Sequence, residues 1–125
     1  MSSESLHEDA EKLGSRVTDQ HRAIFSIMEE LEAVDWYNQR AKATDDHELR
    51  AILEHNRDEE KEHAAMVLEW LRRKDPKLNE HLRTYLFTEA PVTEIEAAAT
   101  EGGGEAPAAA SDGSLGIGSL RQVKK

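Results

Sequence analysis

A glutamate and a histidine three residues apart, Glu60 and His63, are the residues of this 125-residue chain best placed to do chemistry. Side chains at positions i and i+3 of a helix are neighbours on one face, so this carboxylate and imidazole would lie one turn apart. A hard oxygen ligand beside a borderline nitrogen ligand suits iron or manganese. The spacing alone is weak evidence for a metal site, because such pairs also arise by chance.

The surroundings of this pair strengthen the evidence. In helical steps of three and four, Glu60 and His63 interrupt an otherwise apolar row, and burying an unpaired carboxylate costs several kcal/mol or more. Three compensations remain open: a counter-charge from the protein, a polar layer that specifies a dimer, or a metal ion. The full row is Leu49, Leu53, Asn56, Glu60, His63, Val67 and Trp70.

Glu30 offers a further carboxylate at the edge of the apolar face of the preceding segment. Ferritin-like di-iron bundles take one Glu from each of two helices and a Glu-x-x-His pair from each of two others. One copy of this chain supplies half of that set, as Glu30, Glu60 and His63. Two copies related by a twofold axis would supply all of it. The spacing therefore favours a site shared across a dimer interface.

The elements that carry these residues are predicted to be helices. Apolar residues recur at helical spacing over 13–43, and Asp45 followed by Glu48 resembles an N-cap pair that would start a second helix over 46–74. Asp75 and Pro76 are an N-cap and a first helical residue for a third helix over 76–88. No useful strand-like alternation is present. The predicted fold class is all-α: an antiparallel two-helix hairpin plus a short third helix, with dimerisation completing a four-helix bundle.

The two ends differ from this helical region. Residues 1–12 are polar and are predicted to be a flexible N-terminus, and 13–95 to be the folded helical domain. Residues 96–113 are small, rich in Gly and Ala, and lack large apolar side chains, so we expect a disordered linker. Apolar residues return in 114–125 at the end of a disordered tail.

Composition limits the possible functions. Charged residues make up 34% and hydrophobic residues 38% of the chain, and the net charge is −10. This acidity argues against nucleic acid as a partner. The absence of cysteine excludes disulfides and thiolate metal sites. No run approaches the ~20 apolar residues of a membrane span, and no secretory signal is visible, so we expect a cytoplasmic protein without a membrane partner.

Four segments together resemble the encapsulated ferritins, over nearly the whole predicted folded part and the end of the tail. The resemblance implies a ferritin-like hairpin that dimerises around a di-iron ferroxidase centre, with dimers assembling into an open ring, a decamer in described members. It also implies loading into an encapsulin shell through a short C-terminal peptide. The segments are SIMEELEAVDWYNQR (26–40), HNRDEEKEHAAMVLEWLRR (55–73), HLRTYLFTEAP (81–91) and SLGIGSLR (114–121).

The resemblance also implies roles for particular residues. The metal ligands of the family fall on Glu30, Glu60 and His63, and Tyr37 falls on a tyrosine near the centre. A proposed metal-entry site falls on Glu29, Glu32 and Trp36. The cargo signal falls on Leu115, Gly116, Ile117, Gly118 and Leu120.

The function expected from the sequence is a ferroxidase that oxidises Fe²⁺ with dioxygen, for iron mineralisation and storage inside an encapsulin nanocompartment. An alternative is a non-catalytic helical scaffold or adaptor, carried as cargo, in which Glu60 and His63 only specify the dimer interface. A third possibility is a ferritin-like enzyme that uses manganese or a peroxide substrate.

Overall fold

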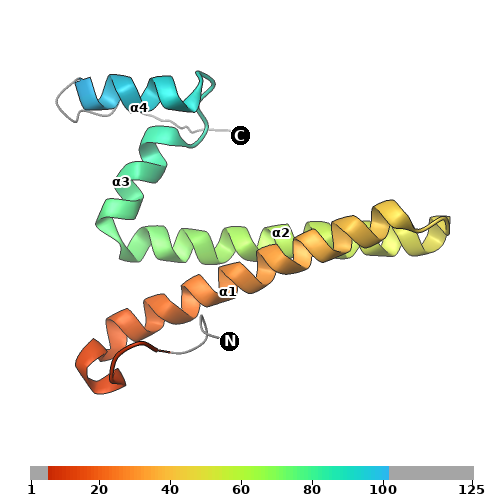
Figure 1. Cartoon of the computed structure of the whole chain (residues 1–125), viewed down its shortest axis with the longest axis horizontal. Helices are drawn as coiled ribbons and strands as arrows, with labels where there is room; N and C mark the ends of the chain where they lie inside the picture. The colour runs from red at the N-terminus through yellow and green to blue at the C-terminus, as the bar shows by residue number, and fades with distance from the viewer. Residues whose placement is uncertain (1–5, 102–125) are drawn as a thin grey trace. The chain divides into compact units, whose positions relative to one another are not determined.

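The computed structural model describes residues 6–101 and is helical throughout the elements it contains (Figure 1). Four helices follow one another: α1 (Ala10–Ala43), α2 (His47–Lys74), α3 (Pro76–Tyr85) and α4 (Val92–Glu101). The predicted all-α class and the predicted long hairpin are confirmed. Within 6–101, no helix is both long enough and apolar enough to span a membrane. The predicted cargo signal lies outside the described residues.

The first helix begins three residues before the predicted start, at Ala10, and it is kinked at Gly14. Gly14 has φ +80° and ψ 167°, a conformation that L side chains rarely adopt, so glycine is needed there. Asp9 accepts backbone bonds from Lys12 and Leu13 ahead of this kink. The predicted flexible N-terminus is therefore too long, because residues 10–12 already form a helical turn.

The hairpin turn between α1 and α2 spans three residues and is fixed by side chains. Asp46, not the predicted Asp45, caps α2 by accepting a bond from the Leu49 backbone N–H at 2.9 Å. From the start of α2, part-buried Arg50 donates back across the turn to the carbonyls of Ala41 (2.9 Å) and Thr44. These carbonyls end α1 and would otherwise lack a helical partner.

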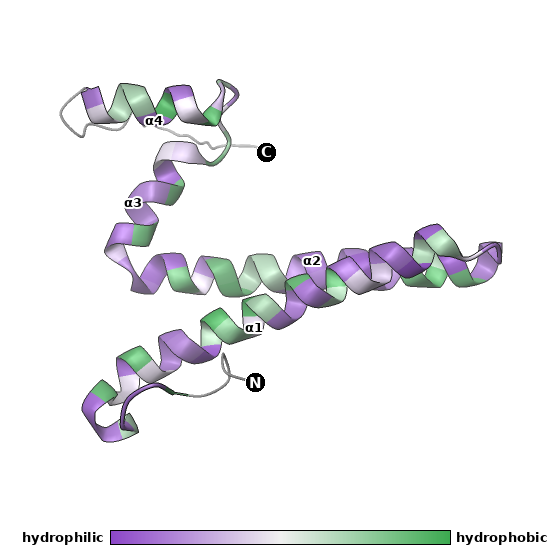
Figure 2. Cartoon of the chain, viewed as in Figure 1, coloured by the Kyte–Doolittle hydropathy of each residue, from purple (hydrophilic) through white to green (hydrophobic). Residues whose placement is uncertain are grey.

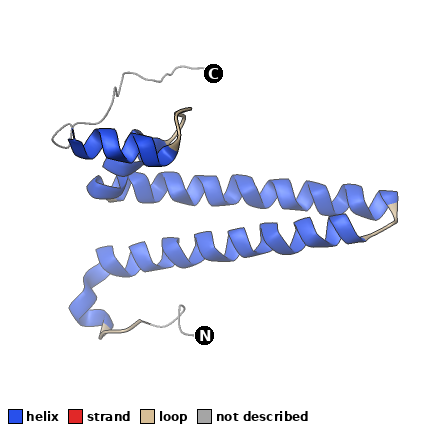
Figure 3. Ribbon diagram, turned by 45° about the horizontal axis from the view of Figure 1, so that its top comes forward, coloured by secondary structure: helices blue, strands red, loops and turns tan. Residues whose placement is uncertain are grey.

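The two long helices pack side by side as an antiparallel pair (Figure 3). Small residues lie at their contact, where Ala23, Ala41 and Ala64 are buried together with Leu71. At the open end of the hairpin, Arg16 and Gln20 of α1 both donate to the Lys74 carbonyl of α2. The hairpin is thus tied at both ends by side-chain bonds to terminal carbonyls.

Much apolar surface remains exposed on the hairpin. Both long helices carry apolar residues along their length, drawn green in Figure 2. Among the described residues no large side chain is less than 2% exposed. A chain with so few buried large side chains has little stability to spare, and a second molecule would find apolar surface to cover. The large exposed apolar side chains of the hairpin helices are Val17, Ile24, Met28, Leu31, Trp36, Leu49, Ile52, Met66 and Trp70.

The third and fourth helices belong to a second compact unit, which begins at Asp75. Asp75 caps α3 by accepting from the Leu78 N–H at 3.0 Å, and Pro76 occupies the first turn, as predicted. The helix ends at Tyr85, earlier than the predicted residue 88, and Phe87 follows with φ +62°.

One prediction for this unit is wrong. The linker was expected from residue 96, but α4 continues through Glu101. Its sequence lacks large apolar residues after Ile95, yet Ala and Glu have high helix propensity. Buried Ile95 gives α4 an anchor, so the helix propagates beyond it into the Ala-rich segment.

Candidate metal centre

Three side chains from the two hairpin helices meet between α1 and α2. Glu30 lies near the middle of α1, and Glu60 and His63 lie one turn apart on α2. The Nδ1 atom of His63 is 3.3 Å from Oε1 of Glu60 and 3.6 Å from Oε1 of Glu30. One ligand atom from each residue lies within 4.8 Å of the other two. We call these three residues the ligand cluster.

The three side chains of the ligand cluster shift one another's pKa values. Neighbouring Glu60 raises the pKa of Glu30, because a proton on one carboxyl can be shared with the other, and partial burial raises it further. The same contact with Glu30 lowers the pKa of Glu60, and His63 adds to that effect. Glu60 and then the charge of Glu30 raise the pKa of His63. A proton and a cation would therefore compete for the same atoms of the ligand cluster.

The donor set fits a transition metal ion. The two carboxylates offer anionic oxygen atoms and the imidazole offers a neutral nitrogen atom, which are ligands that iron and manganese accept. All three side chains are half-buried, with exposed fractions of 28% for Glu30, 24% for Glu60 and 42% for His63. Among the described residues, this is the group of His, Asp and Glu side chains able to share one ion.

The other residues singled out from the sequence lie outside the ligand cluster. Glu29, Glu32 and Trp36 are exposed on α1, and the Trp36 side chain is 47% exposed. Tyr37 is half-buried, and the Arg40 guanidinium lies 5.7 Å from the centre of its ring. The structure therefore brings together Glu30, Glu60 and His63, and it leaves the proposed metal-entry residues on the surface.

A hydrogen bond between α1 and α2 beside the ligand cluster was not predicted from the sequence. Arg57, one turn before Glu60, donates through Nη1 to Oδ1 of Asn38 on α1 at 3.1 Å, and through Nε to Asp58 at 3.0 Å. The sequence shows that Arg57 lies three residues before Glu60. It does not show that Asn38, 19 residues away, is its partner, because periodicity does not give the register between two helices.

An antiparallel helical hairpin with a Glu-x-x-His pair on one helix and a facing Glu on the other has the features of ferritin-like metal proteins. Comparison of sequences agrees, since the profile of the EncFtn-like family matches residues 5–89. The chain belongs to this family of encapsulated ferritins.

Individual relatives cover most of the chain. An "Encapsulated ferritin-like protein" of Rhodospirillum rubrum is 65% identical over 126 residues, which cover 96% of this chain and 90% of that protein. An "Encapsulin nanocompartment cargo protein EncC" of Myxococcus xanthus is 34% identical over 84% of this chain and 87% of its own length. A crystal structure of a protein from Nitrosomonas europaea has a TM-score of 0.68 and 58% identity, covering 70% of this chain and 97% of that one.

Proposed function

We propose that the protein is a ferroxidase that oxidises Fe²⁺ with dioxygen at a centre formed by Glu30, Glu60 and His63 of two chains. One observation carries the proposal: three anionic or neutral metal-ligating atoms from two helices lie within 4.8 Å of one another. Membership of the encapsulated-ferritin family supports iron as the metal.

The need for a second chain follows from the number of ligands. One chain offers two carboxylates and one imidazole, which is half of the set found in ferritin-like di-iron bundles. A twofold axis beside the ligand cluster would bring the same three side chains from a partner. Exposed apolar residues support this arrangement, because Leu49 and Trp70, in the same row of α2 as Glu60 and His63, are 45% and 37% exposed. Dimerisation would bury them, and a ring of such dimers, a decamer in described family members, is the assembly we expect.

The chain's own residues have simple roles in this chemistry. Fe²⁺ is the substrate, and each ion gives one electron to the oxidant. Glu30 and Glu60 supply hard oxygen ligands, which favour the Fe³⁺ product over Fe²⁺. His63 presents Nδ1 toward both carboxylates and would bind iron as a neutral imidazole, so iron binding competes with protonation of His63. No side chain is required as a nucleophile.

The surrounding residues complete the proposal. Tyr37 lies about two helical turns after Glu30 on α1, and we assign its hydroxyl the role of a hydrogen-bond donor near the centre. The proposed metal-entry site on α1 consists of the exposed residues Glu29, Glu32 and Trp36. The two glutamates would attract cations before these reach the ligand cluster.

The tail and the relatives point to where the protein acts. Relatives carry the names "Encapsulated ferritin-like protein" and "Encapsulin nanocompartment cargo protein EncC". We therefore propose that this protein is loaded into an encapsulin shell in the cytoplasm, and that the shell holds the iron mineral. The peptide containing Leu115, Ile117 and Leu120 would bind the shell, and Gly116 and Gly118 would permit close approach of its backbone.

Two variants test the ferroxidase. Glu60→Ala and His63→Ala should each abolish rapid, oxygen-dependent Fe²⁺ oxidation, and Glu62→Ala on the same helix should keep it. Native mass spectrometry after anaerobic Fe²⁺ titration should find one iron per chain, in pairs. Wild-type rates in both ligand variants would refute the assignment. Intact assemblies with no stoichiometric iron would favour the scaffold instead.

A further inference from the structure

A second polar site lies at the turn end of the hairpin, away from the row that carries His63. A hollow of about 300 Å³ opens there between α1 and α2. Three of its six lining residues are cations, although the chain has a net charge of −10. We call it the cationic hollow; it is lined by Asn38, Ala41, Lys42, Arg50, Glu54 and Arg57.

The two arginines of the cationic hollow are held in place by bonds that leave other donors available. Arg50 uses Nε and Nη2 to bind the carbonyls of Ala41 and Thr44. Those bonds also satisfy the C-terminal carbonyls of α1, whose partial negative charge would otherwise repel an anion. Arg57 uses Nε and Nη1 for Asp58 and Asn38, and its side chain is only 22% exposed. A fixed guanidinium loses little entropy when it binds an oxyanion.

Lys42 and Asn38 add further donors. Within the described part of the chain, the Lys42 ammonium forms no hydrogen bond or ion pair, although the chain holds many carboxylates. The Oδ1 atom of Asn38 accepts from Arg57, which directs its amide nitrogen elsewhere as a donor. These groups converge from both helices on one small volume.

We propose that the cationic hollow binds a small protonated oxyanion, with hydrogen phosphate as its simplest form. Glu54 explains why a protonated anion is favoured. An ionised carboxylate can only accept hydrogen bonds, so it repels a fully deprotonated anion such as sulfate. Hydrogen phosphate keeps an O–H that can donate to Glu54 while its other oxygens face Lys42 and the arginines. Glu54 among the three cations would therefore make the cationic hollow select hydrogen phosphate over sulfate.

The test uses the full-length, metal-free protein and isothermal titration with sodium phosphate and with sodium sulfate at equal ionic strength. We expect saturable phosphate binding that is about tenfold tighter than sulfate binding, which is the effect of one well-placed hydrogen bond. Lys42→Gln should weaken phosphate binding about tenfold by removing one charge-assisted bond. Lys12→Gln, on α1 outside the hollow, should leave it unchanged. Both lysines are exposed, so neither change threatens the fold.

Glu54→Gln separates a selective site from a general positive charge. It should bring sulfate affinity close to phosphate affinity, because the amide can donate to either anion and no longer repels. Three results would overturn the proposal: no saturable phosphate binding, equal losses in the two lysine variants, or unchanged discrimination in Glu54→Gln. None of these readouts depends on iron oxidation, so the proposed ferroxidase activity stands or falls separately.

Discussion

Metal binding at the ligand cluster should weaken as the pH falls, with an onset set by His63. The pKa of His63 is raised above 6.5 by its contact with Glu60 and by the charge of Glu30. A metal ion needs the neutral imidazole, so it competes with a proton that the metal-free protein holds more tightly than free histidine does. The folded protein therefore begins to lose affinity at a pH above 6.5.

The size of the effect follows from counting protons. Below the pKa of His63, each bound ion displaces one proton, so affinity should fall about tenfold for each pH unit. A second proton enters at lower pH, because Glu60 raises the pKa of Glu30 above 4.5, and the slope should then approach two. In a dimer with twofold symmetry each ion still has one His63, so the slope per ion is unchanged.

Titration of the metal-free protein with Co²⁺, a redox-stable substitute for Fe²⁺, measures this directly. Calorimetry in two buffers of different ionisation enthalpy gives the number of protons released per ion. His63→Gln should remove the slope that begins above pH 6.5, and His55→Gln, an exposed histidine on the same helix, should retain it. A flat wild-type profile, or a slope that persists in His63→Gln, would refute the reasoning.

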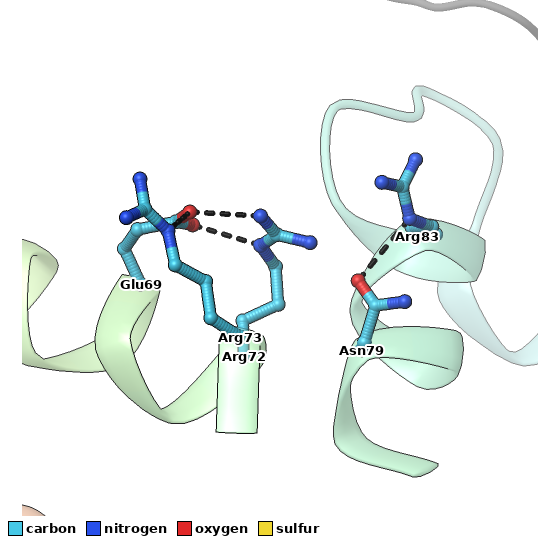
Figure 4. Close-up of polar contacts among 5 residues, drawn as sticks. All are labelled: Glu69, Arg72, Arg73, Asn79 and Arg83. Carbon is cyan, nitrogen blue, oxygen red and sulfur yellow. Dashed lines mark hydrogen bonds and ion pairs between the residues drawn. The ribbon is translucent and has the colours of Figure 1, made fainter. Parts of the chain in front are cut away.

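Two further predictions concern stability. Arg72 and Arg73 bind the carboxylate of Glu69 and lower its pKa to about 2 (Figure 4), so the ionised form stabilises the fold above about pH 4.5, and this contribution is lost as the pH falls toward 2. Because the side chain is 41% exposed, Glu69→Gln should lose less than about 1 kcal/mol at neutral pH, and the loss should shrink below pH 4.5 until little remains near pH 2, in urea unfolding at each pH. Arg50→Ala leaves two carbonyls without a donor and should lower the free energy of unfolding by about 1–3 kcal/mol, whereas Arg22→Ala, an exposed residue paired only within its helix, should change it by less than about 0.5 kcal/mol. Equal losses in these two arginine variants would show that Arg50 has no special role at the turn.

The sequence predicted the features of this protein that depend on short-range periodicity. Glu60 and His63 lie on one face because they are three residues apart on a helix, and that much needs no tertiary information. That Glu30 faces them depends on the short turn, which makes α1 and α2 antiparallel neighbours. The tie from Arg57 to Asn38 and the cationic hollow depend on the exact register of the two helices, which periodicity leaves open.

The errors in the sequence prediction have local causes. Asp45 and Asp46 are adjacent N-cap candidates, and only the backbone geometry of the turn decides that Asp46 accepts from Leu49. For residues 96–101, composition suggested a linker, but helix propensity and the buried anchor Ile95 extended α4. In both places the sequence contained competing signals of similar strength.

The contrast between Glu69 and Glu60 on the same helix explains which carboxylates remain available to a metal ion. Glu69 is enclosed by two guanidinium groups, and with a pKa of about 2 its lone pairs are already committed (Figure 4). Glu60 lies one turn from Arg57, yet the Arg57 guanidinium is directed to Asn38 and Asp58 instead. Because that cation is held by other partners, the side chains that shift the pKa values of Glu30 and Glu60 are each other and His63. A proton on one of these groups can leave when a divalent ion binds, whereas a guanidinium paired with the carboxylates would compete with the ion for their lone pairs. Asn38 and Asp58 would therefore support the proposed metal centre indirectly, by binding the Arg57 guanidinium away from Glu30 and Glu60.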